Sequence, residues 1–100
     1  MGRFVQVIEV VTSDVENLKV LQEEWEQADN GRSGVESVRI SRDRDYTGPG
    51  GDRYLIAVVF PSYEVAARNN DRPETQEFAL LASQLSHSVS FMNLDEVHTW

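Results

Sequence analysis

Phe60–Leu85 reads FPSYEVAARNNDRPETQEFALLASQL, and this stretch decides the predicted fold. It begins as the end of an apolar strand, continues as a short helix, turns at Asn69-Asn70-Asp71 and opens a longer helix at Pro73. Proline suits the first turn of a helix because its missing N–H would have no partner there. The longer helix has one apolar face, formed at helical spacing by Phe78, Leu81, Ala82 and Leu85. Two helices that leave a strand through such a kink predict a pocket beside that strand.

The N-terminal third predicts a strand and then an amphipathic helix. Residues 4–11 (FVQVIEVV) are rich in β-branched side chains and carry apolar residues on both faces of the predicted strand. Ser13 and Glu16 fit a capping box, with Ser13 as the N-cap of the helix. Asn30-Gly31 supplies the left-handed residue that ends it. The apolar positions of this helix are Leu18, Leu21, Trp25 and Ala28.

Three more strands are predicted at residues 35–42, 54–60 and 89–97, with a glycine-rich loop at 45–52 (DYTGPGGD). The order β-α-β-β-α-β predicts the α+β class, as a ferredoxin-like βαββαβ domain with a four-stranded antiparallel sheet. We expect one domain over residues 1–100. Right-handed crossovers then place the helices on one face of the sheet.

The other face of the predicted sheet would be bare, although residues 4–11 and 54–60 are apolar on both sides. Each Val, Ile or Phe left in water forgoes roughly 1.5–3 kcal/mol. An apolar patch of that size is unusual on a monomer. We therefore expect a homodimer, in which a second copy covers this face sheet to sheet and forms an α/β barrel.

The composition narrows the choice of partner. The net charge is −8, from 17 acidic and 9 basic residues, which disfavours nucleic acid and membrane surfaces. RNA-recognition motifs share this topology and stack bases on aromatic residues of their central strands. Arg53, Tyr54 and Phe60 resemble that pattern only weakly, and the sequence has no basic patch. The chain has no cysteine, no apolar run near the roughly 20 residues of a membrane span and no signal-peptide pattern. These features predict a cytoplasmic protein that binds a small molecule or another protein.

The runs 60–67 (FPSYEVAA) and 69–75 (NNDRPET), together with residues 91–95 (FMNLD), resemble the dimeric α/β-barrel superfamily. Within it the chain is most similar to antibiotic-biosynthesis-monooxygenase-type domains, and the resemblance covers nearly its whole length. It implies a homodimer with a pocket for an apolar or aromatic small molecule between each sheet and its helices. Some members oxidise polyaromatic phenols with oxygen and without a cofactor, whereas others bind and degrade haem.

Haem degradation is disfavoured because this chain lacks the residues that haem-degrading members of the family use. Haem-degrading members use an asparagine on the first strand, a tryptophan on the short helix and a histidine on the long helix. The corresponding positions here are Gln6 or Val7, then Ala66 or Ala67, and no histidine falls between residues 73 and 86. The resemblance therefore implies no cofactor.

The first group of candidate site residues is polar or aromatic. Gln6 interrupts an apolar strand face, so its amide is either a pocket hydrogen-bonding group or a dimer contact. Asn69 and Asn70 lie either at the pocket mouth or only in a turn. Three aromatic side chains either line the pocket or belong to the ordinary core, namely Trp25, Tyr54 and Tyr63.

The second group includes the titratable candidates. Phe78 is expected in the helical wall of the pocket. His87 could act as a general base or could simply interact with the end of a helix. Glu96 and His98 alternate on one strand, but two ligands without a third do not make a metal site, so we predict none. The cations Arg39 and Arg53 are either pocket or edge charges.

Two functions follow as hypotheses. The first is a cofactor-independent monooxygenase acting on an aromatic or polyketide-like substrate, with Gln6, Asn70 and His87 as the candidate catalytic residues. The second is a ligand-binding or interaction protein without chemistry, which the lack of a compact acid–base pair in the sequence favours.

Overall fold

The computed structural model describes residues 2–100, so Met1, which the predicted domain includes, lies outside the described residues. The elements follow in the order β1 (Phe4–Thr12), α1 (Val15–Asp29), β2 (Ser37–Arg42), β3 (Asp52–Phe60), α2 (Tyr63–Asn70), α3 (Pro73–Gln84) and β4 (Ser88–Asp95). The strands form one antiparallel sheet in the order β2-β3-β1-β4. This arrangement confirms the predicted ferredoxin-like α+β fold.

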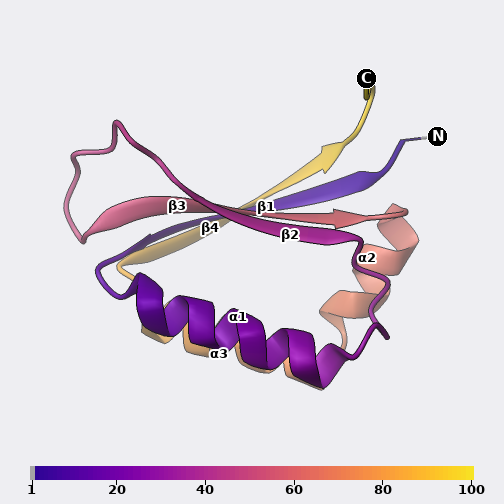
Figure 1. Ribbon diagram of the computed structural model, residues 1–100, viewed down its shortest axis with the longest axis horizontal. Helices are drawn as coiled ribbons and strands as arrows, with labels where there is room; N and C mark the ends of the chain where they lie inside the picture. The colour runs from indigo at the N-terminus through magenta and orange to yellow at the C-terminus, as the bar shows by residue number, and fades with distance from the viewer. Residues whose placement is uncertain (1) are drawn as a thin grey trace.

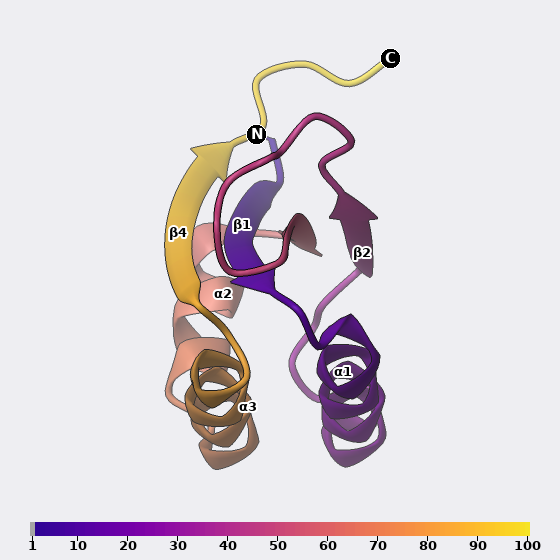
Figure 2. The ribbon, with the colours of Figure 1, turned by 90° about the vertical axis from the view of Figure 1, so that its left-hand side faces the viewer.

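The two long helices cover one face of the sheet and contact each other, with α3 behind α1 in this view (Figure 1). Seen end-on, α1 lies below the β2 side and α3 below the β4 side (Figure 2). The short helix α2 closes one end of this layer, where it connects β3 to α3. No helix crosses the opposite face of the sheet in the described part of the chain.

The start of α1 differs from the prediction. The N-cap is Asp14, whose carboxylate accepts a hydrogen bond from the backbone N–H of Asn17, and not Ser13. The cause is Thr12, which remains in β1 and accepts a hydrogen bond from the backbone N–H of Asp14 at 3.0 Å. Its hydroxyl also donates to the carbonyl of Leu85 at 2.7 Å, so Thr12 joins β1 to both long helices.

The end of α2 also differs from the prediction. Asn69 and Asn70 form the last turn of this helix, and the corner itself is Asp71–Arg72. Arg72 has extended backbone angles (φ −78°, ψ 138°), as a residue before proline prefers, and Pro73 then begins α3. At the end of α1, Asn30 takes the predicted left-handed conformation with φ 48°.

The apolar core lies between the sheet and the helices in two clusters. One surrounds Val10, Leu18, Ile56 and Ala82, beneath the middle of the helices. The other surrounds Phe4, Phe60 and Ala66, where α2 meets the sheet. Gln6 lies between Phe4 and Val10 on the same face of β1, and so between the two clusters. A polar side chain therefore divides the core at this point.

The outer face of the sheet is uncovered, and it is apolar around Val7, whereas β2 contributes Ser37, Arg39 and Ser41 to it. Val7 at its centre pairs with Ala57 on β3 and Met92 on β4. Met92 and Leu94 are 45% and 41% exposed, which is high for strand residues of this type. The same face carries charge near one end, where Arg53 is paired with Glu9 and Asp43.

Candidate functional site

The main cavity lies between the sheet and α3 and has a volume of about 280 Å³. Strands β1 and β4 supply one wall, and the first three turns of α3 supply the other. Its volume is close to the roughly 300 Å³ at which small-molecule pockets begin. The lining is largely apolar with a few amides and one hydroxyl: Gln6, Ile8, Asn70, Thr75, Gln76, Phe78, Ala79, Ala82, Val89 and Phe91.

A smaller cavity of about 50 Å³ lies beside it, towards α1 and β3. Four side chains line both cavities, namely Gln6, Ile8, Thr75 and Phe78. The other lining residues of the smaller cavity are Gln22, Trp25, Val38, Ile56, Val58 and Asn69. The two cavities are therefore neighbouring compartments of the same sheet–helix layer.

A chain of hydrogen bonds fixes the side of the smaller cavity nearest α2. The indole N–H of Trp25 on α1 donates to the hydroxyl of Thr75 on α3 at 2.9 Å. That hydroxyl donates in turn to Oδ1 of Asn69 on α2 at 3.0 Å. Asn69 is only 5% exposed, so its amide oxygen needs such a partner. All three helices are thus joined at the cavity wall.

Gln6 is the polar group of the sheet wall. It pairs across the sheet with Val58 on β3 and Asn93 on β4. Its Nε2 lies 3.4 Å from Oδ1 of Asn93, a long hydrogen bond that leaves the amide free to turn towards a ligand. Asn70, at the end of α2, lines the same cavity.

The lining of both cavities is electrically neutral. Among residues 2–100, those that line them include no His, Lys, Arg, Asp or Glu. The polar groups are carboxamides, the Thr75 hydroxyl and the Trp25 indole. Such groups can donate hydrogen bonds to a carbonyl or enolate oxygen, but they cannot take up a proton near neutral pH.

The donor set does not fit haem or a catalytic metal. Protein ligands of haem iron are His, Cys, Met or Tyr side chains, and none of the described residues that line the two cavities is of these types. Within residues 2–100, no group of three His, Cys, Asp or Glu side chains is arranged to hold a metal ion.

An ion-pair cluster supports the corner between α2 and α3. The guanidinium of Arg72 pairs with Asp29 at the end of α1 and, at 2.8 Å, with Glu74. Asp29 also accepts hydrogen bonds from the backbone and hydroxyl of Ser33, at 2.8 and 2.9 Å. Burial lowers the pKa of Arg72, but the hydrogen bonds and charges of Glu74 and Asp29 outweigh it and raise that pKa above its usual value. The cation therefore holds the helix ends together at any physiological pH.

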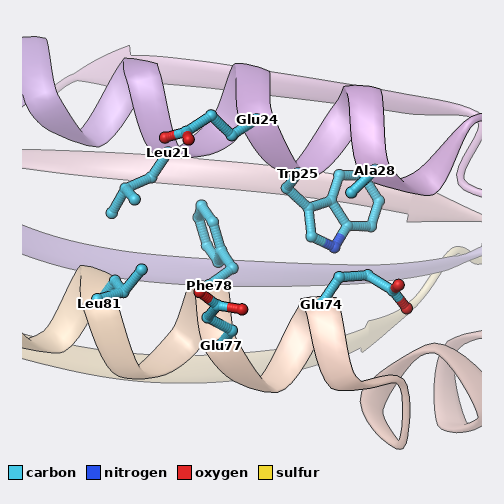
Figure 3. A pocket seen from close by; sticks show the side chains of 8 residues that line it. All are labelled: Leu21, Glu24, Trp25, Ala28, Glu74, Glu77, Phe78 and Leu81. Atoms are coloured by element: carbon cyan, nitrogen blue, oxygen red, sulfur yellow. The ribbon is translucent and has the colours of Figure 1, made fainter.

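A third hollow, the outer groove, lies between α1 and α3 on the side away from the sheet (Figure 3). Its volume is about 250 Å³. Phe78 and Trp25 stand at its floor, and Leu21 and Leu81 approach each other beside them. Glu24, Glu74 and Glu77 lie around it, so its rim is acidic.

The structure brings together five of the sequence-predicted site residues. Gln6, Trp25, Asn69, Asn70 and Phe78 all line the main cavity or its smaller neighbour. They come from β1 and from all three helices, so only the tertiary fold unites them.

The other three candidates lie elsewhere. Tyr54 is buried near the far end of β3, and Tyr63 is 62% exposed with its ring edge-on to Phe4 at 5.4 Å. His87 is exposed and packs against Gly50 in the loop between β2 and β3. None of the three lines the main cavity, its smaller neighbour or the outer groove. A role for His87 as a general base in this cavity is therefore unsupported.

Gln22 and Thr75 line the site but were not anticipated from the sequence. Gln22 lies among the apolar positions of α1, four residues after Leu18 and three before Trp25, and it is 8% exposed. A polar residue on an apolar helical face was the available signal. Thr75 carried no comparable signal, because threonine in a first helical turn is ordinary.

The fold is shared with solved structures of low sequence identity. SnoaB, a cofactor-independent oxygenase from Streptomyces nogalater, superimposes with a TM-score of 0.80 at 14% identity over 99% of this chain and 97% of its own. A proposed antibiotic biosynthesis monooxygenase from Nitrosomonas europaea gives 0.77 at 10% identity over 98% and 94%. A conserved protein from Methanosarcina mazei Go1 gives 0.78 at 8% identity over 96% and 94%.

These comparisons confirm the resemblance at the level of the fold. A scan against family models and a search of curated proteins both find no match for this sequence. The chain therefore has the fold of antibiotic-biosynthesis-monooxygenase-like proteins, and its activity must be argued from its own site.

Proposed function

We propose that this protein binds an apolar, aromatic small molecule in the main cavity. The observation that carries the proposal is a neutral, mainly apolar cavity lined by the carboxamides of Gln6 on β1 and Asn70 on α2. Apolar walls bury the rings of a ligand, and a few amides select its carbonyl or phenol oxygen. The fold shared with a cofactor-independent oxygenase supports the same assignment.

The reaction class that fits best is oxygenation of the substrate by O₂ without a cofactor. An activated CH₂ group of a polycyclic phenol or polyketide would lose its proton to solvent as the substrate enters, because the described residues that line the cavities offer no base. The resulting carbanion would react with O₂. One oxygen atom ends in a new C=O group and the other leaves as water, so the CH₂ carbon supplies the electrons. The protein would exclude solvent and stabilise the enolate oxygen through Gln6 and Asn70.

Oxygen uptake tests this reaction. Anthrone and substituted anthrones are supplied under air, and both O₂ consumption and quinone formation are recorded. Turnover is expected to fall about 100–1,000-fold in Gln6→Ala and in Asn70→Ala if each amide contributes one transition-state hydrogen bond. Asn17→Ala, at an exposed position on α1, is the control. Equal turnover in all four proteins would show that the assigned residues are wrong.

The second candidate function is ligand binding without chemistry. It is favoured by the absence of titratable side chains among the described residues that line both cavities, because the protein then has no base of its own to remove the proton. A ligand that raises the melting temperature and is recovered unchanged would support binding alone. Consumption of that ligand together with O₂ would support the oxygenase.

We also propose that the protein is a homodimer joined through the outer face of the sheet. The uncovered apolar side chains around Val7, Met92 and Leu94 support this assignment. A symmetric pair would bury the same patch of both copies, as a two-fold interface requires. A stable interface of this kind covers roughly 1,200–2,000 Å² in total.

A further inference from the structure

Phe78 lines three separate hollows of the molecule. It contributes to the main cavity, to its smaller neighbour and to the outer groove between α1 and α3. Figure 3 shows its ring standing out from α3 into the space between the helices, with Trp25 of α1 further along the groove. Among the described residues that line these three hollows, Phe78 is the only one common to all of them.

The two aromatic side chains at this point are held differently. Trp25 is fixed by its hydrogen bond to Thr75, which is itself bonded to Asn69. Phe78 has only carbon atoms in its side chain and is half-buried, so only packing limits its rotation. Its neighbours on α3 include Leu81 one turn later and Thr75 one turn earlier. Of the two aromatic side chains, Phe78 is therefore the one that can change its rotamer more easily.

The volumes of the hollows on either side of Phe78 limit the size of the ligand that the main cavity can hold. The main cavity holds about 280 Å³, while drug-sized ligands occupy pockets of roughly 300–1,000 Å³. Ligands larger than the main cavity need space on the other side of the Phe78 ring. That space exists, as the smaller cavity and the outer groove with its volume of about 250 Å³.

We propose that Phe78 is the residue that determines ligand size, as a movable wall between the main cavity and the groove between α1 and α3. The inference rests on the proposed small-molecule function and adds which side chain sets the selectivity. A smaller side chain at this position would join the three hollows into one elongated site. A larger one would restrict the main cavity further.

The test compares two neutral aromatic probes of different size, 1-naphthol with two fused rings and 1-hydroxypyrene with four. Binding is followed by the fluorescence of Trp25 in a Trp100→Phe background, which removes the other of the two tryptophans. Trp100 is fully exposed, so its replacement leaves the site intact. The quantity measured is the ratio of the two dissociation constants.

Phe78→Ala is expected to shift this ratio about tenfold or more in favour of the four-ring probe, since filling or emptying part of an apolar pocket changes affinity roughly 10–200-fold. Phe78→Trp should shift the ratio in the opposite direction, and its dissociation constants are measured from the fluorescence of the probe itself, because this variant carries a second tryptophan. Phe78→Leu is a milder change that keeps the core apolar, and it should give an intermediate shift. It replaces the alanine variant in the test if that variant does not fold.

The matched control is Leu80→Ala. Leu80 is on the same helix and is 58% exposed, and it lines none of the three hollows. Its removal should leave the ratio within about twofold, which is a difference of roughly 0.4 kcal/mol. A ratio unchanged by all the Phe78 variants would overturn this inference while leaving the proposed function in place. Failure of the parent protein to bind either probe would contradict both.

Discussion

Thr75 is the residue on which the hydrogen bonding inside the site depends. Its hydroxyl accepts from Trp25 and donates to Asn69, so one side chain satisfies groups on two other helices. A hydroxyl is suited to this position because it is both a donor and an acceptor. Valine has nearly the same shape and can do neither.

We therefore expect Thr75→Val to lower the free energy of unfolding by about 1–3 kcal/mol, the cost of leaving buried polar groups without a partner. Thr75→Ser keeps the hydroxyl and should recover most of this loss. Urea denaturation followed by circular dichroism measures both variants. Equal stability of the valine and serine variants would contradict the role given to the hydroxyl.

The raised pKa of the Tyr54 phenol leads to a prediction that the protein loses stability at alkaline pH. Burial raises the pKa of its phenol, and the nearby carboxylate of Asp52 raises it further, partly offset by Arg42. The unfolded chain loses this proton near pH 10, before the folded protein does. Stability from the neutral phenol is therefore complete below about pH 9 and declines as the pH rises past roughly 10 towards the folded pKa.

Urea denaturation at a series of pH values between 8 and 11 tests this expectation. Tyr54→Phe should remove part of the alkaline decline while leaving stability at pH 8 nearly unchanged. Tyr63→Phe, at an exposed tyrosine, should leave the decline as it is in the parent protein. An identical decline in the parent and in Tyr54→Phe would contradict the assignment.

The residues found from sequence and those missed differ in a physical way. Trp25 and Phe78 repeat at the spacing of an apolar helical face, and such a face must point to the sheet. Tyr54 shares a face of its strand with Ile56, but it lies too far along that strand to reach the cavity. Thr75 acquires its role only through contacts with distant helices, which sequence spacing does not reveal.

At the scale of elements, the loop between β2 and β3 is constrained where it approaches the end of β1. Gly51 has a φ of 112°, and a Cβ at this position would lie 2.4 Å from the carbonyl oxygen of Thr12. The same Cβ would lie 2.6 Å from the backbone nitrogen of Ser13. Backbone atoms cannot move aside as a flexible side chain can, so only glycine fits.

Gly51→Ala should therefore destabilise the protein more strongly than Gly31→Ala. Gly31 also has a positive φ of 79°, but no atom lies within 4 Å of its added Cβ. The Gly31 variant should lose only the roughly 1–2 kcal/mol of a left-handed backbone. The comparison is made by thermal and urea denaturation. A smaller loss for Gly51→Ala than for Gly31→Ala would contradict the close approach.

The element order was predictable because each helix and strand carries its own local pattern, whereas the ends of elements were not. The N-cap moved from Ser13 to Asp14 because Thr12 is held in β1 by a bond to Leu85, far away in the chain. Asn69 likewise remains helical, where its side chain is bonded to Thr75. Both shifts come from tertiary hydrogen bonds.

At the scale of the whole molecule, the uncovered face of the sheet leads to a prediction about mass. Sedimentation equilibrium at micromolar concentration should give twice the mass of the chain. Val7→Lys places a charge at the centre of the proposed interface and should give a folded monomer. Val20→Lys changes a residue on α1 that is already 50% exposed, so this control should remain dimeric. A monomeric parent protein would contradict the dimer.

The whole molecule is acidic, with a net charge of −8. The acidic residues include Glu24, Glu74 and Glu77 around the outer groove, while the lining of the inner cavities is neutral. Within residues 2–100, no helix is long and apolar enough to cross a lipid bilayer.

Because the lining of the main cavity is neutral, the pH dependence of ligand binding should reflect the acidity of the ligand itself. Between pH 6 and 9 or so, the carboxamides and the hydroxyl keep the same protonation state, because neither group titrates in that range. Any change in affinity across that range must then arise mainly in the ligand. The pH at which binding changes would give the ligand's own pKa, and that value would help to identify the bound molecule before its structure is known.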